Sequence, residues 1–307
     1  MYIDTDRTGC SQRSFLKLNS SFLAGFITFF FLICFISADT YAKETWPAVA
    51  LSKDGTSISY KIYGSGETTL VFVHGWSCDS RYWQKQVPVF SKKYRVIVLD
   101  LAGHGHSGMT RKNYRMSYFG EDVKAVVDAS GSKRVILIGH SMGGAVIVKA
   151  AALMPDRVIG LIGVDTFNNI EFPATSEMLE SMLAPLEKNF QEGTGEFVKG
   201  MLRPETDKSL REWIISDMSS APPSVAISAI NNLVMMYPTG ESTRIFKDIK
   251  VPVIAVNADL EATDIKANRR HMHSFDTVII KNADHFLMLA KPDEFNRGLQ
   301  EAINKIQ

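Results

Sequence analysis

The sequence predicts an α/β fold, in which a doubly wound, mostly parallel sheet carries an inserted helical cap. Short apolar segments with strand character alternate with helical segments between residues 69 and 164. Between residues 167 and 250 this alternation stops, and only helical segments are expected. Because neighbouring parallel strands require crossover helices, the first pattern predicts the sheet and the second predicts an insertion into it.

The expected elements follow one another in a regular order. An edge hairpin comes first, at 48–51 and 57–63, because apolar and polar side chains alternate after the turn residues Asp54-Gly55. Strands are then expected at 69–73, 95–99, 135–138, 158–164, 251–256 and 277–280. Helices are expected between the first four of these, near 80–91, 117–130 and 142–153.

The expected cap lies near 167–250. Prolines separate its helical stretches, which we predict near 175–191, 194–202, 207–219, 223–236 and 241–248. The segment is rich in methionine and aromatic residues. Most of these side chains should form the core of the cap itself, and some could line a pliable apolar pocket. A cap in this position would cover a site at the carboxyl ends of the strands and select what enters.

The segment Gly139-His140-Ser141-Met142-Gly143 lies between an expected strand and an expected helix. This context is typical of a nucleophile elbow, a sharp turn that needs glycines beside the serine and presents the Ser141 hydroxyl above the sheet. The following helix begins at this point, and its dipole favours negative charge that develops there. The sequence therefore predicts Ser141 as a nucleophile rather than as an ordinary surface serine.

Two further segments supply partners for Ser141. The strand at 69–73 ends in His74-Gly75-Trp76, and the loop after such a strand donates one backbone N–H to an oxyanion hole. The expected donors are the backbone N–H groups of Trp76 and Met142. His285 follows the last expected strand, which is where a general base could reach the elbow.

These motifs resemble those of the α/β-hydrolases, over residues 47–307. The resemblance includes Asp100-Leu101-Ala102-Gly103-His104-Gly105-His106-Ser107 as well as the segments above. It is closest to the cap-bearing kind that includes bacterial esterases, lactonases, carbon–carbon hydrolases and cofactor-free haloperoxidases. It implies a Ser-His-acid triad that cleaves a carboxylic ester or lactone through an acyl-enzyme. It implies neither a cofactor nor a metal, and the sequence has no motif with metal-ligand spacing.

The acid of the triad is the point at which the sequence departs from the family pattern. The family usually carries an aspartate after the penultimate strand, and alignment of Ala258 with the usual glycine puts Glu261 there. Asp259 lies in the same loop. Asp165 ends the strand at 158–164, where some members of the family carry their acid. We predict Glu261 first, Asp165 and Asp259 next, and Asp264 last.

Residues 1–42 form a separate N-terminal segment. Arg7, Arg13 and Lys17 precede the uncharged stretch 22–38, and Thr40-Tyr41-Ala42 offers a cleavage site. This order is typical of a secretory signal peptide, so we expect export to a periplasm or the medium, with the mature domain spanning 43–307. The alternative is an uncleaved anchor through residues 22–38, in which case the protein would contact a membrane.

Composition limits the classes of partner. The net charge is +1, and hydrophobic and charged residues make up 45% and 22% of the chain. Such a balance gives no electrostatic basis for binding nucleic acid. We therefore expect a small, ester-like and mainly apolar substrate. The alternatives are a ligand-binding or receptor-type protein with slow or vestigial turnover, a carbon–carbon bond hydrolase and a cofactor-free haloperoxidase.

Overall fold

A computed structural model describes residues 47–307. The N-terminal segment 1–42, with its expected signal peptide or anchor, lies outside the described residues. Within the described part, no helix is both long enough and apolar enough to span a bilayer.

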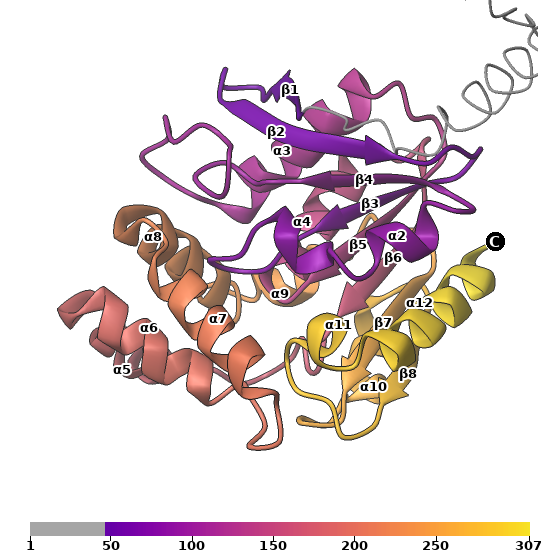
Figure 1. Cartoon of the computed structure of the whole chain (residues 1–307). Helices are drawn as coiled ribbons and strands as arrows, with labels where there is room; N and C mark the ends of the chain where they lie inside the picture. Colours follow the sequence, from indigo (N-terminus) through magenta and orange to yellow (C-terminus); the bar gives the residue numbers. More distant parts are fainter. Residues whose placement is uncertain (1–46) are drawn as a thin grey trace, which may run out of the picture. The chain divides into compact units, whose positions relative to one another are not determined.

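An eight-stranded sheet forms the centre of the fold, with strand order β1-β2-β4-β3-β5-β6-β7-β8 (Figure 1). The strands β1 and β2 pair antiparallel, β2 pairs antiparallel with β4, and the remaining pairs are parallel. This confirms the predicted, mostly parallel sheet. The bounds of the strands are Ala48–Leu51 (β1), Ser57–Tyr63 (β2), Thr69–Val73 (β3), Arg95–Leu99 (β4), Val135–His140 (β5), Val158–Val164 (β6), Val253–Ala258 (β7) and Phe275–Ile280 (β8).

Helices cover both faces of the sheet. The helices α3 (Met116–Ala129) and α4 (Met142–Ala152) pack against each other on one face, and α2 (Val87–Phe90) and α12 (Pro292–Ile306) lie on the other (Figure 1). The segment predicted as one helix near 80–91 is instead a 3₁₀ turn, η1 (Ser80–Trp83), followed by α2. Pro88 explains the break, because proline is tolerated only in the first turn of a helix. Three helices were not predicted from the sequence: α10 (Ile265–His271), α11 (Leu287–Ala290) and α12.

Between β6 and β7 the described chain contains only helices, which we call the helical insertion. Four of them, α5 to α8, lie together beyond the carboxyl ends of the parallel strands (Figure 1). The insertion therefore lies over the end of the sheet where a site is expected. The bounds of its helices are Ser176–Lys188 (α5), Phe190–Lys199 (α6), Lys208–Ser219 (α7), Pro223–Val234 (α8) and Glu241–Arg244 (α9).

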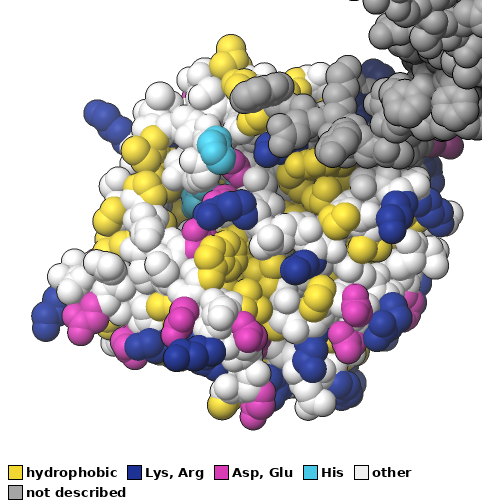
Figure 2. Space-filling model, in the orientation of Figure 1, with side chains coloured by type: hydrophobic (Ala, Val, Ile, Leu, Met, Phe, Trp, Pro, Cys, Tyr) yellow, Lys and Arg dark blue, Asp and Glu magenta, His cyan; other side chains and the backbone are white. Residues whose placement is uncertain are grey.

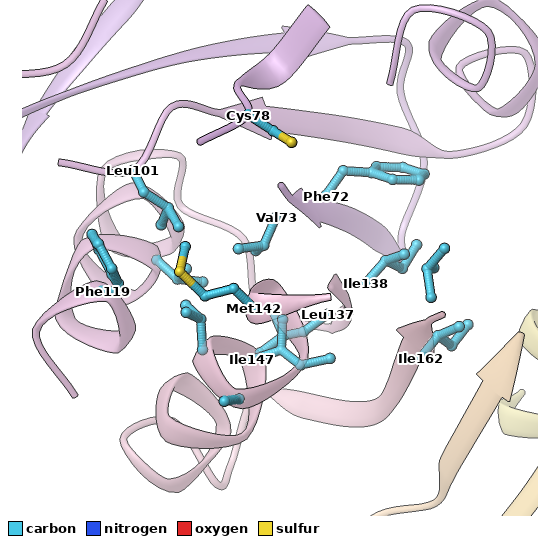
Figure 3. Packing of buried hydrophobic residues seen from close by; sticks show 14 of the residues in the cluster. Phe72, Val73, Cys78, Leu101, Phe119, Leu137, Ile138, Met142, Ile147 and Ile162 are labelled. Carbon is cyan, nitrogen blue, oxygen red and sulfur yellow. The ribbon is translucent and has the colours of Figure 1, made fainter. Parts of the chain in front are cut away.

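The apolar core lies between the sheet and the helices. Met142, the first residue of α4, is fully buried, and its side chain points into the layer that contains Leu101, Phe119 and Ile147 (Figure 3). This packing fixes the start of α4, and therefore the turn that precedes it. The surface is mixed in charge: on the face shown in Figure 2, Lys and Arg side chains are interspersed with Asp and Glu.

A buried ion pair between Arg111 and Asp122 joins the loop before α3 to that helix. The Asp122 carboxylate is fully buried and accepts hydrogen bonds from Arg111 Nη1 at 2.9 Å, Ser52 Oγ at 2.6 Å and the backbone N–H of Ala102 at 3.2 Å. The Arg111 side chain is only 4% exposed. Removing one partner of a buried pair leaves an uncompensated charge, which costs more than removing both.

We therefore expect Arg111→Met to lower the free energy of unfolding by about 3–5 kcal/mol. The double variant Arg111→Met/Asp122→Leu, which removes both charges, should be more stable than the single variant. Urea denaturation at pH 7 measures both. A loss below 1 kcal/mol for Arg111→Met would contradict a stabilising role for this pair.

Candidate active site

Ser141 lies in a strained turn between β5 and α4. Its backbone has φ 52° and ψ −116°, a conformation that non-glycine residues rarely adopt. Its N–H donates to the carbonyl of Val164 at 2.9 Å, which holds the turn against the end of β6. A strained backbone of this kind persists only where the surrounding structure enforces it, and such sites cluster where function requires them.

The flanking glycines make this turn possible. A Cβ atom on Gly139 would lie 2.2 Å from the carbonyl oxygen of Gly143, and one on Gly143 would lie 2.7 Å from the carbonyl oxygen of His74. Any side chain at either position would collide with backbone. The G-x-S-x-G pattern therefore has a direct steric cause here.

His285 contacts Asp165, with 2.6 Å between Nδ1 of the imidazole and Oδ2 of the carboxylate. The other carboxylate oxygen of Asp165 accepts from the backbone N–H of Ala258 at 2.8 Å. A carboxylate can only accept a hydrogen bond, so Nδ1 of His285 carries the proton of the neutral imidazole. Nε2 of His285 is then able to accept a proton. His285 and Ser141 line the same cavity, so the structure brings together the predicted nucleophile, the predicted base and one of the predicted acids.

Asp165 contacts His285 in the structure, whereas Glu261, which the sequence placed first among the acid candidates, does not. Asp165 directly follows β6, the neighbour of β5, and its φ of 45° lies in the left-handed region. Glu261 is exposed and lines the cavity without contacting His285. Asp259 instead bonds to Arg203 at 2.8 Å, and Asp264 caps α10 by accepting from Ala267 N–H.

Two buried asparagines hold the loop that carries Asp165. Asn257 accepts from the N–H of Thr166 at 3.2 Å and donates to the carbonyl of the same residue at 3.0 Å. Asn268 donates to the carbonyl of Phe167, whose φ of 59° is also in the left-handed region. Neither asparagine was predicted from the sequence. The available signal was Asn257 itself, a polar residue inside the apolar strand β7 that is fully buried.

The predicted oxyanion donors come from two different segments, the start of α4 and the loop after β3. Met142 is the first residue of α4, so its backbone N–H has no acceptor within the helix. Trp76 follows β3 in the loop opposite, and its backbone N–H has no backbone acceptor within residues 47–307. The indole Nε1 of Trp76 donates to the carbonyl of Ala226 in α8 at 2.8 Å, which anchors this loop to the helical insertion.

The helical insertion also holds the loop that carries His285. The backbone N–H of His285 donates to the carbonyl of Met201 at 3.2 Å, and Thr206 Oγ1 donates to Asp284 Oδ2 at 2.5 Å. Arg203 Nε donates to the carbonyl of Ala283 at 2.7 Å. From the opposite side, Nε2 of His140 donates to the carbonyl of His285 at 2.9 Å. These contacts fix the His285 backbone from two directions, and sequence analysis identified none of them.

The cavity above Ser141 has two lobes. The smaller lobe has a volume of about 260 Å³ and is lined by His285, Trp76 and Phe286, among others. The larger lobe has about 600 Å³ and is lined mainly by apolar residues from the loop after β6 and from the insertion, including Phe172 and Tyr237. Ser141, Asp165 and Glu261 line both lobes. The lobes therefore meet at Ser141, the predicted nucleophile.

Three buried histidines near the site are neutral. Burial lowers the pKa of His74, lowers that of His140 well below its usual value, and lowers that of His104 to about 3. His104 Nδ1 donates to the carbonyl of Ala102 at 3.0 Å. A protonated imidazole in these positions would be a buried and uncompensated charge.

Stability should fall in acid because of these histidines. Their pKa is lower in the folded than in the unfolded protein, so below about pH 6.5 the unfolded state binds more protons. Between about pH 6 and pH 3, His104 should cost about 1.4 kcal/mol of unfolding free energy per pH unit, and His74 and His140 should add to this loss. Thermal unfolding at pH 7, 6 and 5 measures this loss. His104→Asn keeps a hydrogen-bond donor near the position of Nδ1 and should make stability depend less steeply on pH. An unchanged dependence would contradict the conclusion that His104 is neutral in the folded protein.

Among the described residues, no group of three or more His, Cys, Asp or Glu side chains is arranged to hold a metal ion. Cys78 lines the smaller lobe but is buried, and burial raises the pKa of its thiol well above the usual value. A thiol in this state is a poor nucleophile.

Residues 68–211 match the family model for the alpha/beta hydrolase fold. This chain has the α/β-hydrolase fold. The eight-stranded sheet and the elbow at Ser141 agree with that match. The solved structure of a bromoperoxidase from Bacillus anthracis has a TM-score of 0.73 with this α/β-hydrolase at 21% identity, covering 84% of this chain and 100% of the other. That likeness supports the fold alone.

Sequence relatives of this α/β-hydrolase match over a shorter length. It is 39% identical over 102 residues to the dihydrolipoyllysine-residue acetyltransferase component of the acetoin cleaving system of Pseudomonas putida, covering 33% of this chain and 28% of that protein. It is 35% identical over 107 residues to a bifunctional esterase/perhydrolase of Acinetobacter calcoaceticus, covering 34% and 39%. The matches thus span well under half of the length of these relatives.

Proposed function

We propose that this α/β-hydrolase is a serine hydrolase that cleaves a carboxylic ester or lactone of a small, mainly apolar substrate. The observation that carries the proposal is the 2.6 Å contact of His285 with Asp165, beside a serine held in a strained elbow. An imidazole oriented by a carboxylate at Nδ1 is the arrangement that activates a serine hydroxyl. Names of relatives such as esterase/perhydrolase agree with this chemistry.

In the proposed mechanism, Ser141 Oγ attacks the carbonyl carbon while its proton passes to Nε2 of His285. The Asp165 carboxylate stabilises the imidazolium through Nδ1. The N–H groups of Met142 and Trp76 hold the oxyanion of the tetrahedral intermediate. Collapse breaks the bond to the leaving oxygen, which takes the proton from His285 and leaves an acyl-enzyme. Water, deprotonated by His285, then attacks the acyl-enzyme and restores Ser141.

The proposed role of the helical insertion is that of a cap. It supplies much of the lining of both lobes, and it also contacts the loops that carry Trp76 and His285. A cover of this kind excludes water and selects substrates by shape.

A fluorophosphonate probe tests this function. It should label the mature protein once, at Ser141, and short methyl esters should be hydrolysed with release of acid in a pH-stat. Labelling that persists in Ser141→Ala would contradict the assignment of the nucleophile. Saturable ligand binding with neither labelling nor turnover would favour the alternative, a receptor-type protein that retains the fold.

Perhydrolysis is a second candidate activity, favoured by the esterase/perhydrolase relative. In that reaction hydrogen peroxide replaces water in the attack on the acyl-enzyme and yields a peracid. Addition of peroxide to the ester assay, with detection of peracid, distinguishes the two outcomes. Carbon–carbon bond hydrolysis would use the same triad with a ketone substrate.

We further propose export of the protein through a signal peptide in residues 1–42, with an anchor at 22–38 as the alternative. The proposal depends on the basic, apolar and small-residue order of that segment. Sequencing the N-terminus of natively expressed protein tests it. A start near Lys43 supports cleavage, an intact N-terminus in the membrane fraction supports the anchor, and an intact soluble cytoplasmic form contradicts both.

A further inference from the structure

The two lobes of the cavity differ in their relation to His285. The smaller lobe is lined by His285 and Phe286, together with aromatic and methionine side chains such as Phe197 and Met218. The larger lobe is not lined by His285 and is lined instead by residues such as Thr166 and Ser242 of α9. The protein therefore presents a small space on the side of the base and a space about twice as large on the other.

Proton transfer fixes which part of an ester enters which lobe. His285 must give its proton to the leaving oxygen, so that oxygen must lie next to the imidazole. The leaving alcohol then extends into the smaller lobe, and the acyl chain extends into the larger one. This argument rests on the proposed function, because it requires His285 to act as the acid.

The charges that line the cavity are acidic. Among the described residues that line either lobe, none is Lys or Arg. Asp165 is paired with His285, whereas none of the ion pairs formed by the described residues involves Glu261. Burial, and to a smaller extent the negative charge of Glu261, raises the pKa of Tyr237, which lines the larger lobe. The unpaired carboxylate lines both lobes and therefore also acts on the space that would hold the acyl chain.

We propose that the site takes neutral or cationic esters whose acyl group is larger than their leaving alcohol, and that Glu261 excludes substrates with a carboxylate on the acyl chain. The shape of the two lobes determines the orientation of the ester, and the unpaired Glu261 determines the preference for charge. In this role Glu261, which the sequence suggested as the triad acid, acts on substrate selection instead.

Two isomeric esters test the orientation. Methyl octanoate and heptyl acetate have the same composition but carry their long chain on opposite sides of the ester. We expect kcat/KM for methyl octanoate to be higher by about tenfold or more, because each methylene placed in a fitting apolar pocket contributes that order of discrimination. A ratio of one or below, with measurable turnover, would overturn the orientation and leave the serine hydrolase function intact.

A matched pair of variants tests the lobes themselves. Gly200 lines the smaller lobe and has a helical backbone, and a Cβ there would meet no atom nearer than 3.4 Å. Gly200→Leu should therefore be tolerated. It should raise the ratio of kcat/KM for methyl octanoate to kcat/KM for heptyl acetate. Ala174 lines the larger lobe, and Ala174→Leu should lower it. Changes in the opposite directions would overturn the assignment of the lobes. If neither isomer nor methyl acetate is hydrolysed, the proposed function fails and the inference fails with it.

Charge is tested with three methyl esters of equal chain length: methyl octanoate, monomethyl octanedioate and methyl 8-aminooctanoate. We expect the anionic ester to be hydrolysed least efficiently. Glu261→Gln should raise the ratio of anionic to cationic turnover about threefold to tenfold, since solvent screens an exposed carboxylate in part. The effect should shrink in 1 M salt. An unchanged ratio in Glu261→Gln, with the neutral ester still hydrolysed, would overturn the role of Glu261.

Discussion

Ser141→Ala should lower kcat for ester hydrolysis by about 10⁴-fold or more, because without the hydroxyl no acyl-enzyme can form. The loss should exceed that of any other single substitution in the site. The substitution removes one oxygen at a half-buried position, so the melting temperature should change little. Initial rates on a methyl ester, together with thermal unfolding, measure both quantities.

The matched control is Cys78→Ser, which changes the other nucleophilic side chain that lines the same lobe. Its thiol is buried and protonated, so fluorophosphonate labelling of this variant should persist. If Ser141→Ala keeps more than about 1% of wild-type kcat while folded, acylation of Ser141 is not the chemical step.

Asp165→Asn should lower kcat by about 10⁴-fold with little change in KM. The amide oxygen of Asn can still accept the hydrogen bond from Ala258, so the loop should keep its shape. The amide nitrogen, however, faces Nδ1 of His285 and favours the imidazole tautomer that carries its proton on Nε2. That tautomer cannot accept the serine proton, and the charge that stabilises imidazolium is lost as well.

The comparison with Glu261→Gln decides between the acid candidates. On a neutral ester we expect this variant to lose less than about tenfold in kcat, far from the loss expected for a triad acid. Melting temperatures of both variants separate misfolding from loss of chemistry. If Glu261→Gln is inactive and Asp165→Asn is active, the catalytic conformation differs from the one described here.

The sequence by itself determined the architecture and two members of the candidate triad. The apolar strand segments, their alternation with helices and the break between β6 and β7 are local patterns, and local patterns follow from side-chain periodicity. Ser141 was identifiable because the elbow demands glycines at fixed spacing, and His285 because it follows the last strand. These features do not depend on how distant loops meet.

Only the tertiary structure decided the acid, the contacts that hold His285 and the division of the cavity. Asp165, Asp259 and Glu261 all follow neighbouring strands, so chain order leaves them equivalent. What separates them is the left-handed backbone at Asp165, held by Asn257 and Asn268, which aims one carboxylate at the imidazole. Such turns are set by contacts between loops far apart in the chain, which no local periodicity records.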